Sequence, residues 1–193
     1  LSQNTLSLLA PNASDATALR VGLLNSGSAG AKTGALTVNY FSDGTGTTGA
    51  AALNAGSETL ALSGNVYRLA SGTFSTNALN LGTIRANAST SAFNASLSVS
   101  NAAPADGFSD LLRVAGSASN GFELTSGSNA LSSLTLAALE SAPLSVRYTG
   151  SIAGGGAKAG SLTFTLTSIG QPGLGLADKT RPSQILPVTA TVF

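Results

Sequence analysis

The residue types that most often carry out chemistry in proteins are scarce in this sequence. Histidine and cysteine are both absent, so the chain lacks the commonest general base, a thiol nucleophile and the usual zinc ligands. Serine, aspartate and glutamate occur, but a hydrolase without histidine needs a Ser-Lys pair or two carboxylates, and no such pair falls in a recognisable motif. We therefore expect no enzyme activity, no cofactor, and no catalytic, cofactor-binding or metal-binding residue.

Two Asp-Gly pairs and two lysines remain as candidates for binding or covalent chemistry. Asp43-Gly and Asp106-Gly resemble parts of calcium loops, but each supplies one carboxylate and a calcium site needs several oxygen ligands, so plain turns are favoured. Lys32 and Lys158 recur at equivalent turns and could form an isopeptide bond with asparagine. No glutamate is placed to catalyse that bond, so a solubilising charge beside a turn is the favoured interpretation.

Three Asn-Ala-Ser triplets, at Asn12, Asn87 and Asn94, fit the pattern for N-glycosylation. A chain rich in asparagine, serine and threonine produces such triplets by chance. Glycosylation at these positions is therefore left open.

Charge and hydropathy exclude several classes of protein. The 193 residues include 9 basic and 8 acidic side chains, a net charge of +1, so there is no basic surface for nucleic acid or anionic lipid. No run of about 18 apolar residues is present, so we expect no membrane insertion. Because the chain contains no methionine, Leu1 is not its own initiator, and we expect an exported, extracellular or cell-surface product whose signal peptide has been removed.

The sequence contains a long internal repeat. Residues 31–67 return at 157–193 with a constant offset of 126 (157 − 31), without a gap across 37 positions, and 12 of these positions are identical. A second match, of Leu6, Leu9, Leu19 and Val21 to Leu131, Leu134, Leu144 and Val146, has an offset of 125. A repeat of this length sets the architecture before any local prediction is made.

Within the repeat, the pattern of apolar residues predicts strands and no helix. Apolar side chains recur at every second position, and glycine and β-branched residues are scattered throughout. We predict strands over residues 6–8, 18–23, 35–41, 59–69, 79–84, 92–100 and 108–114, and one beginning at 121. Residues 25–34, 42–56 and 150–156 and the run NAAPADG read as loops or turns.

The repeat divides the chain into one and a half modules. One module is about 126 residues long, so residues 68–193 form a complete module, whereas residues 1–67 match only the second half of one. The predicted fold class is all-β, as tandem immunoglobulin-like β-sandwiches of which the first is incomplete. The predicted core of the complete module is Leu81, Ile84, Phe93, Leu97, Val99, Phe108, Leu112, Val114, Phe122, Leu134, Leu144, Val146, Tyr148, Leu162, Phe164, Leu166, Leu186, Val188 and Val192.

Several motifs carry a family resemblance. The runs GNVYRLASG, LNLGTI, ASLSVSNAAPADGFSDLLRV and AKAGSLTFTLTS, with the loop SDGTGTTG, resemble the tandem repeats of bacterial choice-of-anchor D exoproteins, many of which carry PEP-CTERM sorting tails. This resemblance implies immunoglobulin-like β-sandwich modules of the ASH and PapD-like type in a secreted, multi-module surface protein. It implies no catalytic or ligand-binding residues.

The half module has two interpretations. In the first, the chain belongs to a longer tandem array, or its sandwich is smaller than the repeat suggests. In the second, the missing strands come from another copy of the chain. Strand donation by a terminal segment, residues 183–193 or 1–9, would join copies head to tail into a cell-surface filament. The partner is then the protein itself.

These interpretations leave two classes of function. The first is an extracellular structural protein, as a filament subunit or repeat segment. The alternative is a monomeric surface adhesin or carbohydrate-binding module within a longer array, for which Tyr40, Phe41 and Tyr67 are the clustered aromatic candidates, although they alternate into a core as easily.

Overall fold

The computed structural model describes residues 5–6, 9–23, 26–87 and 93–193. These residues contain strands, turns and coil, and none of them forms a helix that could cross a membrane. The chain divides into two compact units, Leu1–Val66 (unit one) and Tyr67–Phe193 (unit two), and each is described by itself.

Unit two is built from two five-stranded sheets. The first sheet has the order β3 (Gly72–Phe74), β5 (Asn94–Asn101), β10 (Ser141–Tyr148), β7 (Phe122–Ser126) and β8 (Asn129–Ala130). The second sheet has the order β4 (Leu79–Ile84), β12 (Lys179–Val192), β11 (Gly156–Ile169), β6 (Leu111–Ala118) and β9 (Leu134–Leu136). Neighbouring strands run antiparallel, except that β4 pairs parallel to β12.

The strand order identifies an immunoglobulin-like β-sandwich. If β3, β5, β10 and β7 are strands A, B, E and D, the first sheet has the order ABED, and β6, β11 and β12 are then strands C, F and G of the second sheet. The chain changes sheets between β3 and β4, so the first strand of the fold is split between both sheets. The predicted all-β, immunoglobulin-like fold class is confirmed for this unit.

The core of unit two lies between the sheets and follows from the alternation of its strands. In β11, Leu162, Phe164 and Leu166 are buried, whereas the intervening threonines face outward. One apolar cluster combines such residues from both sheets. Tyr148 packs edge to face on the rings of both Phe93 and Phe122.

Most of the predicted core residues are buried, and Ile84 and Leu134 pack against the cluster from its margin. Phe108 is the exception, because it lies half-buried in the loop between β5 and β6, with its ring centroid 5.7 Å from that of Tyr67. The prediction also missed Leu124, Leu131 and Leu136, which are buried in the same cluster.

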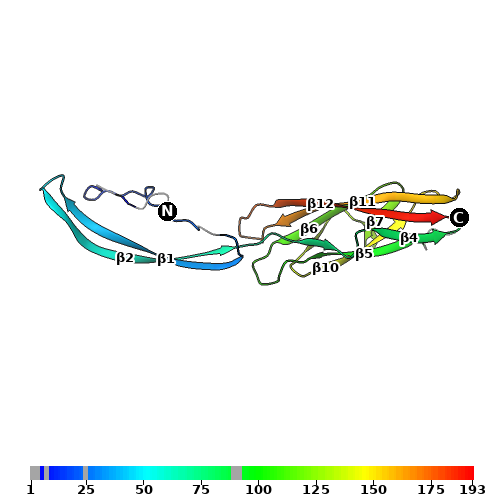
Figure 1. The fold of residues 1–193 in the computed structure, drawn as a ribbon, viewed down its shortest axis with the longest axis horizontal. Helices are drawn as coiled ribbons and strands as arrows, with labels where there is room; N and C mark the ends of the chain where they lie inside the picture. Colours follow the sequence, from blue (N-terminus) through cyan, green and yellow to red (C-terminus); the bar gives the residue numbers. More distant parts are fainter. Residues whose placement is uncertain (1–4, 7–8, 24–25, 88–92) are drawn as a thin grey trace. The chain divides into compact units, whose positions relative to one another are not determined.

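In unit one, the described strands are β1 (Gly30–Gly44) and β2 (Ala50–Val66), which form one long antiparallel hairpin (Figure 1). Its register repeats that of β11 and β12. Leu36 lies opposite Leu60 as Leu162 lies opposite Leu186, and Gly30 opposite Val66 as Gly156 opposite Val192. Each hairpin also has a register shift, after Tyr40 in unit one and after Phe164 in unit two, but these places are not equivalent, because Phe164 corresponds to Val38. The internal repeat therefore records a repeated strand pair.

The predicted long loop over residues 42–56 is wrong. Strand β1 continues to Gly44 and β2 begins at Ala50, so only a short turn separates them. The backbone N–H groups of Thr47, Thr48 and Gly49 all donate to the carbonyl oxygen of Gly44 and close this turn. The glycines in this stretch suggested a loop, but two strands that continue to pair with each other satisfy their backbone groups and extend through them.

The strand predicted over residues 18–23 is also wrong. Residues 9–23 form no strand, although Leu19 and Val21 correspond to Leu144 and Val146 of β10. Strand β10 pairs with both β5 and β7. Unit one contains no counterpart of either strand, so the backbone groups of residues 18–23 have no neighbouring strand to pair with. Of the short strand predicted over residues 6–8, residues 7–8 lie outside the described residues.

Matched leucines in the two hairpins test the difference in burial. We expect Leu162→Ala to lower the free energy of unfolding of unit two by about 2–5 kcal/mol, because Leu162 is fully buried. The same change at Leu36 should alter that free energy by about 0.5 kcal/mol or less, as is usual for residues away from a core. Urea unfolding followed by the fluorescence of the tyrosines measures both, and equal losses would contradict the division into two units.

Candidate assembly site

The hairpin of unit one presents an apolar face that the rest of the described unit leaves uncovered. We call this the hairpin face, formed by Gly34, Leu36, Val38 and Tyr40 of β1 and by Leu60 and Leu62 of β2, which the register places on one side. Tyr40 is 45% exposed and Leu60 is 43% exposed. Their counterparts Leu166 and Leu186 are each 3% exposed in unit two.

The same hairpin has two open edges. In the part of the chain that the structure describes, β1 and β2 pair only with each other. In unit two, β11 also pairs with β6, and β12 also pairs with β4. A sheet edge with unpaired backbone groups beside an apolar face is a template for further strands.

A hydrogen bond links Tyr40 of the hairpin face to Glu58. The hydroxyl of Tyr40 donates to Glu58 Oε2 at 3.0 Å, and this bond to a carboxylate raises the pKa of Tyr40 above its usual value. Phe41 follows Tyr40 on the same strand and so points to the opposite face. Tyr67 belongs to unit two and packs on Phe108. The structure therefore does not arrange Tyr40 and Phe41 as an aromatic platform for a carbohydrate.

A polar cluster lies where the chain enters unit two, and we call it the entry cluster. Arg68 donates its backbone N–H to the carbonyl oxygen of Phe108 at 2.9 Å, and Asp110 donates its own to the carbonyl of Arg68 at 3.0 Å. The Arg68 guanidinium binds Asp106 Oδ2 at 2.7 Å and the Ser109 hydroxyl at 3.1 Å. Hydrogen bonds and an ion pair thus join the motifs GNVYRLA and SNAAPADGFSD to each other, and we call this connection the clamp.

The inner part of the entry cluster is buried. Asp110 is 5% exposed, and its Oδ2 accepts a hydrogen bond from the Ser168 hydroxyl at 2.8 Å. The Ser168 oxygen in turn accepts the backbone N–H of Ala70 at 2.7 Å. The Asn101 side chain accepts from Ser71 N at 3.1 Å and donates to the Asp110 carbonyl at 3.1 Å. With one carboxylate and otherwise neutral partners, this part of the cluster fastens strands together and offers no acid-base pair.

The two Asp-Gly candidates form turns, whereas Lys32 and Lys158 lie in strands β1 and β11 and not in the predicted turns. Asp43 Oδ1 accepts from Thr45 N at 2.9 Å, and Asp106 Oδ1 accepts from Phe108 N at 3.0 Å, which is the pattern of an Asx turn. The described residues contain no group of three or more acidic, histidine or cysteine side chains that could hold a metal ion. Lys32 donates to the hydroxyl of Ser28 at 2.9 Å. Asn12, Asn87 and Asn94 are exposed, and their glycosylation stays a prediction.

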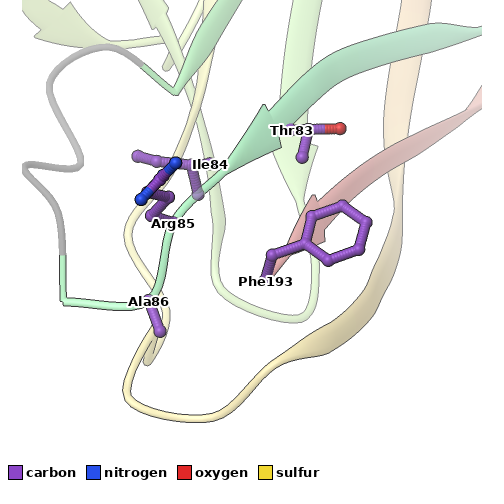
Figure 2. A pocket seen from close by; sticks show the side chains of 5 residues that line it. All are labelled: Thr83, Ile84, Arg85, Ala86 and Phe193. Carbon is purple, nitrogen blue, oxygen red and sulfur yellow. The ribbon is translucent and has the colours of Figure 1, made fainter.

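Two hollows lie on the surface of unit two among the residues that the structure describes. Figure 2 shows one beside the last residue of β4, lined by Thr83, Ile84, Arg85, Ala86 and Phe193. The ring of Phe193 is largely exposed, at 74%. A second hollow lies between residues 72–77 and 184–186.

Comparison with known proteins adds little beyond the fold. No family model matches the sequence, and no curated protein matches it either. The chain is similar to PapD-like domain 7 of human CEP192, with a TM-score of 0.42 and 10% identity over 63% of this chain and 84% of that one. It is also similar to the E. coli chaperone DraB, with a TM-score of 0.42 and 13% identity over 65% of this chain and 57% of DraB.

A third likeness is to CfaE, the adhesive subunit of the CFA/I fimbria of enterotoxigenic E. coli, with a TM-score of 0.42 and 13% identity over 85% of this chain and 59% of CfaE. This chain thus spans just over half of DraB and of CfaE. TM-scores at this level carry no argument about function. The strand order of unit two by itself makes the protein an immunoglobulin-like β-sandwich protein.

The clamp of the entry cluster makes the stability of unit two depend on pH. The Arg68 guanidinium, together with the Phe108 N–H, lowers the pKa of Asp106 from its usual value. A pKa that is lower in the folded state stabilises the fold above the unfolded pKa and ceases to do so as the pH falls through the folded value. We expect Asp106→Asn to lower the Tm of unit two at neutral pH, and the gap from the parent chain to close as the pH falls below about 3.8.

Calorimetry across this pH range measures the gap, with Asp43→Asn as the control. Asp43 lies in a similar Asp-Gly turn, but in unit one, so its replacement should leave the Tm of unit two unchanged at every pH. A gap that stays constant into acid would show that the Asp106 carboxylate does not stabilise unit two through its charge.

Proposed function

We propose that this chain is part of an extracellular structural protein built as a tandem array of immunoglobulin-like modules. The observation that carries the proposal is the hairpin of unit one, which repeats the register of β11 and β12 over most of its length. A chain that encodes the same strand pair twice, one module length apart, is built by repetition. The resemblance of its motifs to the repeats of choice-of-anchor D exoproteins supports the extracellular location.

The boundary between the two units supports serial arrangement. Strand β2 ends at Val66 and unit two begins at Tyr67, so no linker separates them along the chain. Tyr67 packs on Phe108, and Arg68 is held by the entry cluster. Phe193 is the counterpart of Tyr67 in the repeat.

The strand order also suits a module that carries load. Strand β4 lies near the start of unit two and β12 at its end, and the two are parallel neighbours, with Leu79 opposite Val188 and Ile84 opposite Val192. Pulling the ends of unit two apart therefore shears the ladder between β4 and β12, so that its hydrogen bonds resist together. We infer that resistance to pulling is part of the function.

Strand donation between copies is a second candidate, favoured by the open edges and apolar face of the hairpin. Two observations place it second. Residues 183–193, one of the two expected donors, are mostly engaged in β12, between β11 and β4. Moreover, unit one lacks counterparts of several strands, so one donated strand would leave much of the hairpin face bare.

The two candidates differ in how the purified chain assembles. As an array segment, the chain should sediment as a monomer at every concentration and show no fibres by electron microscopy. As a donating subunit, it should form regular fibres that lengthen with concentration. Such fibres would overturn the array proposal.

If unit two carries load through β4 and β12, a proline in β4 should lower the unfolding force more than a proline in the other edge strand, β9. In force spectroscopy that pulls residues 67 and 193 apart, Thr83→Pro should lower the unfolding force, because a proline in β4 breaks the ladder to β12. Thr135→Pro is the control, since Thr135 lies on the other edge strand, β9, opposite Arg113. The control should lower the Tm but leave the unfolding force near that of the parent chain. Equal losses of force would argue against shearing of β4 and β12.

A further inference from the structure

We propose that the hairpin face is the docking surface for the first half of another module of this same type. The occupant is a segment equivalent to residues 67–125, carried in the same polypeptide ahead of residue 1. This inference rests on the proposed function, because it places the chain in a tandem array. It adds what covers the hairpin and which side chains recognise the cover.

Unit two shows which side chains cover the face of β11 and β12 that corresponds to the hairpin face. Leu162 and Phe164 are fully buried in unit two, in one cluster with residues of β5, β6 and β7. The ring of Phe74 lies 4.5 Å, centroid to centroid, from that of Phe164. The stretch 67–125 also supplies Ala70, Leu79, Leu81, Phe93, Leu97, Val99, Leu112, Val114, Phe122 and Leu124 to this cluster. This stretch belongs to the half of the module that has no counterpart in unit one. A two-stranded hairpin is at best marginally stable in water, so unit one needs such a cover.

The glycine at position 34 is evidence for what covers the hairpin face. A Cβ added at Gly34 meets no atom within 4 Å, so nothing in the described unit explains a glycine inside this strand, where it weakens pairing. At its counterpart Gly160, an added Cβ would lie 2.7 Å from the ring of Phe122 and 2.8 Å from the Ser119 carbonyl oxygen. The glycine is thus explained by a ring that packs on it, and we assign a ring equivalent to Phe122 to the space over Gly34.

Ser42 gives a second piece of evidence, through the hydrogen bonds that its counterpart Ser168 makes in unit two. It is exposed in unit one, whereas its counterpart Ser168 is fully buried and donates to Asp110 at 2.8 Å while accepting from Ala70 N at 2.7 Å. Both Asp110 and Ala70 belong to the first half of the module. The occupant that fits Ser42 therefore brings a buried carboxylate as well as an apolar surface.

The coil ahead of the hairpin fits the same occupant. Leu19, Val21 and Leu23 are 43%, 51% and 58% exposed, and their counterparts in β10 are Leu144, Val146 and Tyr148, which are 0%, 0% and 6% exposed. Strand β10 lies between β5 and β7. A first half that supplies both neighbours would turn residues 18–23 into a strand and bury these side chains.

A second copy of the chain does not supply this occupant. Each copy contains one first half, and that half is already part of the core of its own unit two. Each copy also contains two second halves, so exchange between copies leaves one of them uncovered however many copies associate. The occupant is therefore additional polypeptide, and the repeat order places it N-terminal to the hairpin.

The test is an extended chain in which a second copy of residues 67–125 precedes Leu1. Hydrogen exchange followed by NMR compares the amides of β1, β2 and residues 18–23 with those of the parent chain. We expect exchange to slow by on the order of a hundredfold or more, as when a marginal hairpin joins a cooperative sandwich. Calorimetry should show a second unfolding transition beside that of unit two.

Two matched glycine variants test the ring over Gly34. Gly34→Ala should abolish the added protection in the extended chain, while leaving the hairpin of the parent chain unchanged or firmer. Gly64→Ala is the control, because Gly64 also has no atom within 4 Å of an added Cβ and its counterpart, Ala190, is buried with a Cβ. The control should keep the added protection in full.

A second pair of variants tests the carboxylate. Ser42→Ala should lower the Tm of the new transition in the extended chain, because it leaves the buried carboxylate without its donor. Ser57→Ala is the control, since its counterpart Ser183 is exposed. If both serine variants behave alike, the predicted contact of Ser42 is absent.

The outcomes separate this inference from the array proposal. If the hairpin amides of the extended chain exchange as fast as those of the parent chain, the docking inference is wrong, whereas a parent chain that stays monomeric still supports an array. If the parent chain alone protects its hairpin amides in a concentration-dependent way, a second copy is the cover, and both proposals fail. Protection that Gly34→Ala does not remove would also overturn the docking inference, because the cover would then pack differently.

Discussion

The structure depends on one constraint, which is that the apolar face of the last two strands of the module must be covered by strands from the first half. In unit two this condition is met, and Leu162, Phe164 and Val188 are fully buried. In unit one the same hairpin, in the same register, keeps its pairing but not its burial. Local pairing therefore survives without the cover, whereas the buried core does not, as expected when the burial of apolar area supplies most of the stability.

The sequence was sufficient to predict many of the strands that meet a partner inside the chain, although not β3, β8 or β9. The strand predicted over residues 79–84 was found with the same limits, and the strand predicted over residues 35–41 lies within β1. Residues 18–23 have the pattern of a strand but not its ladder, because alternation is local and pairing is not. The loop predicted over residues 42–56 failed for the opposite reason, since paired backbone groups carried β1 and β2 through a run of glycines.

The candidate sites were less visible in the sequence. The motifs that contain Arg68 and Asp106 were recognised as characteristic, but not as partners, because 38 residues separate them and hydrogen bonding across that distance leaves no periodic signal. The bond between Ser168 and Asp110 spans 58 residues. One signal was available: Gly34 and Ser42 are identical in both copies of the repeat, and the two positions constrained by the missing half are among those that did not vary.

Apolar burial by itself does not explain how a module in an array selects its own first half, because two uncovered hairpin faces would also bury area against each other. The Ser168–Asp110 bond supplies the discrimination. If two second halves paired, each would bury a serine hydroxyl with no carboxylate to receive it, and an unsatisfied buried polar group costs about 1–3 kcal/mol. A first half brings the carboxylate of Asp110 and the N–H of Ala70 to the same hydroxyl, so the bond is made only in the correct pairing. The ring of Phe122 over Gly160 acts in the same direction, because it needs a glycine at one position of one strand. Polar and steric matching thus give these repeats a specificity that their shared apolar pattern lacks.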